Sequence, residues 1–423
     1  MTDKEFPRTL DPSILSEDVR RMKDFVLSKI AGQDRAVGQF VKVLQMIMVG
    51  LNKPNRPAGV FLFTGPTGVG KTETVRATAE ALLGSKDALT RVDCGEYQHS
   101  HEISKLIGSP PGYVGYTDRE AIRLSQDKID KFQTRKYKIN FVLFDEIEEA
   151  HPALLAVMLQ ILDAGRLTLG TGGTVDFSKT IVVLTSNLGE KDAQKVMAGT
   201  QLGLAPVAKN SETTDQQVYK ASKAAATKHF QAKFMNRVDR VVVFRSLAED
   251  SLRKILKIEL ADLQYRIWET ALTKWASDGS AGQLNLFRPV IRTTKAAEDL
   301  LIKEGTSRTY GARELNRAID RFMTFPLAAL IGSKQIASGD EVEADHEDGK
   351  RDLTFRITGH RDVAPLPPVK YDGSPAAIVN VKDLPVTEAP RSSESAKGWT
   401  IYRPKSLPSE KIQDPLPRKP FKW

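Results

Sequence analysis

The residues best suited to chemistry form a glycine-rich run, GPTGVGKT, at positions 65 to 72. The run fits the pattern G-x-x-x-x-G-K-[ST], whose glycines let the backbone curl so that successive N–H groups point at phosphates. Lys71 offers a compact positive charge to the outer phosphates, and the Thr72 hydroxyl is placed to ligate Mg²⁺. A glycine turn that merely joins a strand to a helix is the alternative. The residues predicted to bind ATP are Gly65, Pro66, Thr67, Gly68, Val69, Gly70, Lys71 and Thr72.

A second set of reactive side chains lies in FVLFDEIEEAH, positions 141 to 151. Asp145 is predicted to hold Mg²⁺, and Glu146 is predicted to orient and polarise the attacking water. We expect Glu148 and Glu149, which continue the acidic run, to form a solvated start of a helix. For Asp145 and Glu146 the alternative is an acidic first helix turn that performs no chemistry.

The elements that would position these residues are short apolar runs of strand length. One run precedes the glycine-rich loop, and an apolar stripe at helical spacing follows it until Gly84. Helical or loop-like segments separate the other runs, which predicts an α/β fold whose parallel sheet is covered on both faces. The predicted strands are Val60–Phe63, Leu89–Val92, Phe141–Phe144, Ile181–Leu184 and Val241–Phe244.

Changes in composition along the chain predict four segments. Residues 1–20 are a polar arm, and residues 21–245 form the large ATPase domain. Residues 246–359 form a smaller, mainly helical domain with a small sheet, closed by the strand-like stretch DLTFRIT. Of the 22 prolines, 11 fall after residue 360, so we expect residues 360–423 to be a largely disordered tail. Its aromatic side chains could bind a partner, although a solvated tail is the plainer interpretation.

Charge and cysteine content restrict the partners and the compartment. The formal net charge is +9, but Lys and Arg are scattered, so nucleic acid is permitted and not indicated. Cys94 is the single cysteine, so no intrachain disulfide forms and a reducing compartment is expected. The most apolar early stretch, residues 40–51, contains Lys42 and Gln45, so we predict no membrane segment and a cytoplasmic protein.

Several stretches in order along residues 20 to 357 resemble the Clp/ClpB-type AAA+ ATPases. The similarity is closest to the second ATPase ring and C-terminal small domain of the ClpA, ClpB and ClpC unfoldases. The stretches that carry it are IAGQDRAV, FLFTGPTGVGKTE, IGSPPGYVGY, VLFDEIEEAH, LQILDAGRLT, TVDF, TSN, FMNRVD and YGAREL.

This resemblance implies roles for further residues. Ile30 and Ala31 would line the adenine pocket, and Asn187 would be a sensor that helps to place the lytic water. Asn187 could instead be an ordinary strand-end cap. Arg237 resembles an arginine finger that reaches the nucleotide of a neighbouring subunit, which implies a homo-hexameric ring. Arg313 resembles a second sensor that connects the small domain to the nucleotide. Taken without their motifs, both arginines would be surface residues.

Two loops carry the implied contacts with other proteins. Tyr113 and Val114, in GYVGY, resemble a pore loop that grips an extended polypeptide; a tyrosine packed in a glycine turn is the alternative. Leu202-Gly203-Leu204 resembles a tripeptide that docks on a peptidase ring, although three residues are a short signal and an unremarkable loop is the plainer interpretation. Zinc binding by Cys94, His99 and His101 is not expected, because no second ligand pair has suitable spacing.

The predicted function is an ATP-hydrolysing ring that unfolds, translocates or remodels protein substrates, alone or with a peptidase. An ATP-gated assembly or scaffold subunit that binds a partner through the tail is the second hypothesis. A nucleic-acid remodelling motor, favoured by charge alone, is the third. We expect no substrate-collecting N-terminal domain, first ATPase ring or coiled-coil insertion in this length, and hence no disaggregation of the kind that depends on that insertion.

Overall fold

The computed structural model describes residues 11, 13–109, 112, 123–189, 211–277, 288–306 and 311–361. Within these residues a five-stranded sheet has the order β2-β3-β6-β1-β7, and every neighbouring pair is parallel. Because the strands are parallel, their carboxyl ends meet at one edge, where Asp93 stands opposite Asp145. The strands are β1 (Gly59–Thr64), β2 (Thr90–Asp93), β3 (Asn140–Asp145), β6 (Thr180–Ser186) and β7 (Arg240–Val243).

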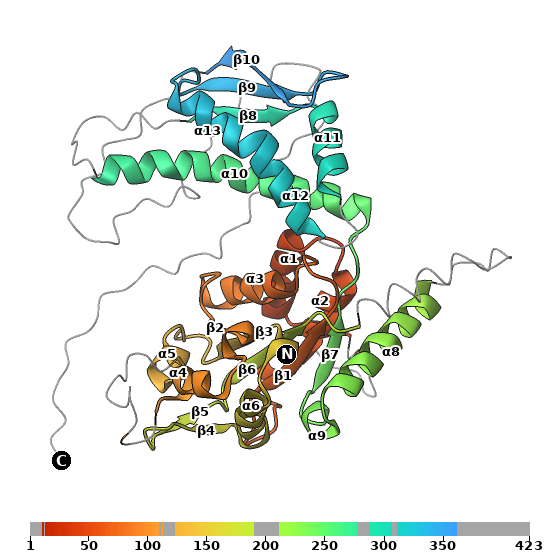
Figure 1. Ribbon diagram of the computed structural model, residues 1–423, viewed down its shortest axis with the longest axis vertical. Coiled ribbons are helices and arrows are strands. Elements are labelled where there is room, and N and C mark those ends of the chain that lie inside the picture. The colour runs from red at the N-terminus through yellow and green to blue at the C-terminus, as the bar shows by residue number, and fades with distance from the viewer. Residues whose placement is uncertain are drawn as a thin grey trace, which may run out of the picture. The chain divides into compact units, whose positions relative to one another are not determined.

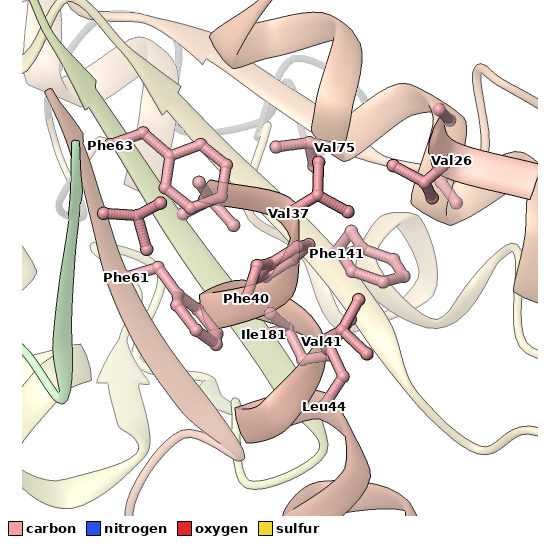
Figure 2. Close-up of a cluster of buried hydrophobic side chains, with 14 of the residues drawn as sticks. Val26, Val37, Phe40, Val41, Leu44, Phe61, Phe63, Val75, Phe141 and Ile181 are labelled. Carbon is pink, nitrogen blue, oxygen red and sulfur yellow. The ribbon is translucent and has the colours of Figure 1, made fainter. Parts of the chain in front are cut away.

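Three helices cover one face of this sheet (Figure 1). They are α1 (Glu17–Lys29), α2 (Asp34–Met48) and α3 (Lys71–Leu83). Phe40 of α2 packs edge-on against Phe61 and Phe63 of β1, with ring centroids 4.7 and 5.2 Å apart (Figure 2). Edge-to-face aromatic pairs stabilise beyond their buried area, so this cluster fixes α2 on the strand that leads into the glycine-rich loop.

The opposite face is covered by a second set of helices, which buries the alternate residues of the strands, such as Val60 and Leu62. The longer helices are α6 (Pro152–Ala164) and α8 (Ser211–His229). The short elements are α4 (Ser104–Ile107), α5 (Gln126–Asp130), α9 (Ala232–Met235) and the 3-10 turns η1 (Cys94–Tyr97), η2 (Ser100–Ile103) and η3 (Ile147–Glu149). A hairpin of β4 (Arg166–Thr168) and β5 (Thr174–Asp176) follows α6.

The chain from residue 249 onward builds a separate core around a small sheet. β9 pairs antiparallel with β10 and parallel with β8, giving the order β10-β9-β8. Phe322 and Met323, in the π-helical turn η4, are buried in this core. Its elements are α10 (Glu249–Ser277), β8 (Val290–Thr293), α11 (Lys295–Gly305), α12 (Ala312–Ile319), η4 (Asp320–Thr324), α13 (Phe325–Gly332), β9 (Asp340–Asp345) and β10 (Thr354–His360).

The predicted fold class is confirmed: a parallel α/β sheet precedes a mainly helical part with a small sheet. The five predicted strands coincide with β1, β2, β3, β6 and β7 to within two residues at each end. The sequence did not predict β4, β5, β8 or β9, and β10 begins two residues later than DLTFRIT. No helix among the described residues combines the length and the apolar character needed to cross a membrane. Of the predicted tail, residues 360 and 361 are described, and His360 ends β10; the rest of the tail lies outside the described residues.

Candidate active site

The glycine-rich loop joins the end of β1 to the start of α3, as its sequence predicted. Gly65 has φ of 145°, and a Cβ at this position would overlap the carbonyl oxygen of Phe244. Gly70 caps α3 with φ of 97° in the left-handed region, which glycine adopts without steric cost. The loop therefore leaves its backbone bare at a helix N-terminus, which is the arrangement that accepts a phosphate group.

Lys71 is buried at the centre of this loop, with 8% of its surface exposed. Its Nζ donates to the carbonyl oxygens of Gly65 and Pro66, 2.6 and 2.8 Å away, and to Asn187 Oδ1 at 2.8 Å. A buried ammonium needs such acceptors to remain charged. The loop thus holds a positive charge in place beside its own backbone, where phosphates would contribute further acceptors.

The carboxylate of Asp145 lies next to the loop at the end of β3. Thr72 Oγ1 donates to Asp145 Oδ1 at 3.2 Å, and Thr185 Oγ1 donates to the same oxygen. Arg91 Nη2 is 2.6 Å from Asp145 Oδ2. A hydroxyl and a carboxylate side by side are the hard oxygen ligands that Mg²⁺ prefers, so Thr72 and Asp145 fit the predicted ion.

Glu146 follows directly and has φ of 55° and ψ of 54°, in the left-handed region. Non-glycine residues occupy this region at a cost of about 1 to 3 kcal/mol, and such strain is concentrated at functional sites. The Glu146 N–H donates to Thr185 Oγ1 at 3.1 Å, so Thr185 braces both acidic residues. The chain therefore turns sharply at Glu146 and leaves its carboxylate half-buried at the strand edge.

Asn187 follows β6, and its side chain contacts the glycine-rich loop. Its Oδ1 accepts from Lys71 Nζ at 2.8 Å and from Thr67 Oγ1 at 3.4 Å. These contacts differ from those of a strand-end cap, whose side chain would bond to its own neighbouring backbone. Asn187, Lys71 and Asp145 thus converge from three neighbouring strand ends on one place.

Ile30 and Ala31 lie at the turn between α1 and α2. Ile30 is buried, and its side chain would be 3.7 Å from a Cβ on Gly70, so it borders the loop. Ala31 is half-buried. The sequence did not predict a role for the neighbouring Gln33, whose side-chain amide is buried and makes two hydrogen bonds to the backbone of Arg245. Gln33 Nε2 donates to the Arg245 carbonyl oxygen at 2.8 Å, and the Arg245 backbone N–H donates to Gln33 Oε1 at 3.1 Å. Gln33 therefore ties this turn to the chain just beyond β7.

Arg313 is exposed in the first turn of α12. The preceding residue, Ala312, donates its backbone N–H to the carbonyl oxygen of Gly68 at 3.0 Å. Gly311 has φ of 51°, and a Cβ there would lie 2.9 Å from the carbonyl oxygens of Thr67 and Gly68. The structure thus brings the chain beside Arg313 to the glycine-rich loop, and glycine at 311 permits the approach.

Arg237 lies just after α9, and its described contacts are with Asp163 and Arg56 and not with the glycine-rich loop. Its guanidinium forms an ion pair with Asp163 near the end of α6, and its carbonyl oxygen accepts from Arg56 Nη2 at 3.3 Å. The side chain is 35% exposed. The described contacts therefore do not join Arg237 to Lys71, Asp145 or Glu146.

The expectation that Glu148 forms part of a solvated helix start is wrong, because this residue is half-buried. Its Oε1 accepts the backbone N–H of Asn187 at 2.7 Å, and its Oε2 is buried without a hydrogen-bond partner among the described residues. Glu149 alone of the two is exposed. Nothing in the sequence distinguishes the two residues, since both belong to one acidic run.

Cys94 is fully buried, whereas His99 and His101 are exposed. Burial raises the pKa of the Cys94 thiol well above its ordinary value, and the charges of Asp93 and Asp145 add to the effect. Among the described residues, no group of three or more His, Cys, Asp or Glu side chains is arranged to hold a metal ion. Tyr113, Val114 and Leu202-Gly203-Leu204 lie outside the described residues.

A strand, a bare glycine turn around a buried lysine, and an acidic end on a second strand of the same parallel sheet define a P-loop nucleotide-binding domain. Comparison with known families agrees. Residues 56–241 match the AAA domain (Cdc48 subfamily), and residues 247–344 match the C-terminal, D2-small domain of ClpB protein. Residues 56–344 are therefore a Clp/ClpB-type AAA+ domain followed by a D2-small domain, which confirms the resemblance found in the sequence.

Individual relatives show how much of a longer protein is matched. The chain is 38% identical over 336 residues to the ATP-dependent Clp protease ATP-binding subunit ClpA homolog of Cyanidium caldarium, covering 79% of this chain and 36% of the relative. It is 37% identical over 338 residues to chaperone protein ClpB 1 of Parasynechococcus marenigrum (strain WH8102), covering 80% and 35%. The chain thus spans about a third of the length of these relatives.

Solved structures of Hsp104 share the fold. The S. cerevisiae Hsp104:casein complex in its extended conformation is 32% identical, with a TM-score of 0.61, and the match covers 81% of this chain and 53% of that one. A closed-state reconstruction of Hsp104 with ATPγS and FITC casein is 31% identical, with the same TM-score of 0.61 and the same coverage.

Proposed function

We propose that this chain is a magnesium-dependent ATPase that uses ATP hydrolysis to unfold, translocate or remodel protein substrates. The observation that supports it most directly is the convergence of Lys71, Asp145 and Asn187 on the glycine-rich loop. We assign the ATPase to residues 21–245 and the small domain to residues 246–359, between an arm of residues 1–20 and a tail of residues 360–423.

Different residues in and around the loop would bind the phosphates, the adenine and Mg²⁺. Its backbone N–H groups and Lys71 would bind and orient the phosphates, while Ile30 and Ala31 would bind the adenine. Thr72 and Asp145 would hold Mg²⁺, which neutralises charge on the phosphate oxygens when bound. The loop supplies positioning and fixed charge, which account for most of the catalysis in phosphoryl transfer.

The attacking water would be positioned by Glu146 and Asn187, which follow β3 and β6. Glu146, turned out of β3 by its left-handed backbone, would orient the water and accept its proton. Asn187 would hold the water from the other side, because an amide both donates and accepts hydrogen bonds. Water attack on the outermost phosphorus breaks the bond to the bridging oxygen, giving ADP and phosphate.

We propose that the site is completed by a second subunit in a homo-hexameric ring. Arg237, held by Asp163 in the described structure, would reach the nucleotide of the neighbour, and Arg313 would contact the nucleotide of its own subunit. The family match and the position of Ala312 against Gly68 support the second assignment. A shared site would make hydrolysis depend on ring assembly.

Protein substrates are proposed from the relatives, because casein accompanies Hsp104 in both of the solved structures. Tyr113 and Val114 would grip the polypeptide. A peptidase ring at Leu202-Gly203-Leu204, a partner of the tail and a cytoplasmic location are further proposals that rest on the sequence. No specific contact among the described residues favours a scaffold subunit or a nucleic-acid motor.

The test is loss of fluorescence from a tagged, stably folded fluorescent protein in the presence of ATP. The parent chain should unfold it, and Glu146→Gln should bind a fluorescent ATP analogue yet cause no loss. Glu149→Gln makes the same chemical change at an exposed neighbour and should behave like the parent. Unfolding that persists in Glu146→Gln, or that proceeds without ATP, would contradict the proposal.

A further inference from the structure

We propose that Glu148 is a positioning residue for Asn187, through which it controls the rate of hydrolysis. The inference rests on the proposed function, because it takes Asn187 as the residue that helps to place the water. Glu148 itself would touch neither nucleotide nor water.

The contact joins the turns that follow two neighbouring strands. Glu148 lies in η3 after β3, Asn187 follows β6, and β3 and β6 are paired in the sheet up to Phe144 and Leu184. Beyond that pairing, Glu148 Oε1 accepts the Asn187 backbone N–H at 2.7 Å. A hydrogen bond to a carboxylate is shorter and stronger than one between neutral groups, so it can fix the peptide that carries the Asn187 side chain.

Asn187 is thereby held at both ends. Its backbone N–H is bound by Glu148, and its side-chain Oδ1 is bound by Lys71 and Thr67 of the glycine-rich loop. If nucleotide phosphates take over the ammonium of Lys71, the bonds to Glu148 and Thr67 remain on Asn187, and the bond to Glu148 is the shorter, at 2.7 Å against 3.4 Å. Misplacement of a catalytic group by about 1 Å can cost a hundredfold in rate, so this constraint bears directly on hydrolysis.

The other carboxylate oxygen of Glu148 argues against a role in stability alone. Oε2 is buried without a hydrogen-bond partner among the described residues, and burial of an unsatisfied polar atom costs free energy. A buried polar group that lacks a partner calls for an explanation, and a functional role is one that fits a residue bonded to Asn187. Glu149, one residue further on, is exposed and provides a matched control.

The experiment is a double-mutant cycle on steady-state ATP hydrolysis by the full chain. Glu148→Ala should lower kcat about tenfold to a hundredfold and leave KM and the binding of a fluorescent ATP analogue within about twofold. Asn187→Ala should lower kcat at least as much. The double variant should be no slower than Asn187→Ala, because a residue that acts only through Asn187 has nothing left to position.

Conservative variants separate positioning from folding. Glu148→Gln keeps a carbonyl oxygen at the right distance but loses the charge, so it should recover part of kcat, whereas the shorter Glu148→Asp should stay slow. Glu149→Ala should match the parent chain. These variants also decide the matter if Glu148→Ala fails to fold.

Three results would overturn the inference. If Glu148→Ala slows the Asn187→Ala chain by the same factor as the parent, Glu148 acts independently of Asn187. If Glu148→Ala and Glu148→Asp leave kcat unchanged while Asn187→Ala is slow, the positioning role is wrong and the proposed site stands. Full activity of Asn187→Ala would instead refute the proposed role of Asn187, and the inference with it.

Discussion

The charged side chains at the glycine-rich loop are satisfied by other protein groups in the structure described. The ammonium of Lys71 rests on two carbonyl oxygens and an amide oxygen, and Asp145 receives two hydroxyls and the guanidinium of Arg91. Because an unpaired buried charge is strongly destabilising, these partners offset the cost of burying the two groups. Binding of a nucleotide would therefore exchange partners within a prepared site.

Cys94 offers a direct chemical test of burial at this edge of the sheet. Its thiol is fully buried and its pKa is raised, chiefly by burial, so the reactive thiolate is scarce at pH 8. We expect no reaction with a colourless aromatic disulfide reagent over minutes in the folded protein, and one equivalent of colour after addition of denaturant. Since Cys94 is the single cysteine, fast labelling of the native protein would contradict the described packing.

The sequence predicted those site residues that are consecutive or belong to a motif, such as Lys71 and Asp145. Gln33 and Glu148 also lie in quoted stretches, but their contacts were not predicted, because their partners, Arg245 and Asn187, are far away along the chain and meet them only in the folded protein. Their side chains are chemically ordinary and carry no spacing signal. Folding alone distinguishes Glu148 from the exposed Glu149.

At the scale of elements, the strands with the clearest sequence signal are those in which burial on both faces leaves a continuous apolar run. All six residues of β1 and of β3 are buried, so these strands stand out from the sequence. β9 has the sequence DEVEAD, and only its alternate residues are buried. Its acidic side chains interrupt the apolar pattern, so the sequence does not predict a strand there. The three-residue strands β4 and β5 are too short to show a period.

Helix α2 should depend on Phe40 for its place on the sheet. Phe40 is buried against Phe61 and Phe63 (Figure 2), and large-to-small changes of this kind cost about 3 to 5 kcal/mol. We therefore expect Phe40→Ala to lower the free energy of unfolding in urea by that amount. Met46→Ala on the same helix, where the side chain is 39% exposed, should cost much less. Equal costs for the two variants would show that the aromatic cluster does not anchor α2.

At the scale of the whole molecule, the described contacts assemble most of one site and leave Arg237 apart from it. Lys71, Asp145, Asn187 and the chain beside Arg313 converge on the glycine-rich loop, whereas Arg237 is paired with Asp163. A guanidinium that contributes to hydrolysis must come close to the transferred phosphoryl group. This separation is expected if the arginine serves a neighbouring copy of the chain.

The single variant tests whether Arg237 contributes at all. Arg237→Ala should bind a fluorescent ATP analogue as the parent does and lose roughly a thousandfold in kcat, the usual scale for an arginine finger. Lys233→Ala, which removes an exposed cation of α9, should retain activity. Full hydrolysis by Arg237→Ala would refute the shared site.

Mixing two inactive variants tests whether the contribution crosses a subunit boundary. Arg237→Ala subunits keep Glu146, and Glu146→Gln subunits keep Arg237, so a mixed ring contains some boundaries at which both residues are intact. If Arg237 acts on the neighbour, mixing should restore measurable hydrolysis, with a maximum at intermediate ratios and none in either pure variant. If it acts within its own subunit, every subunit still lacks one of the two residues and no ratio restores activity. If rings shown to contain both variants hydrolyse no ATP at any ratio, Arg237 acts within its own subunit. Its ion pair with Asp163 would then be a contact that holds the side chain within that subunit.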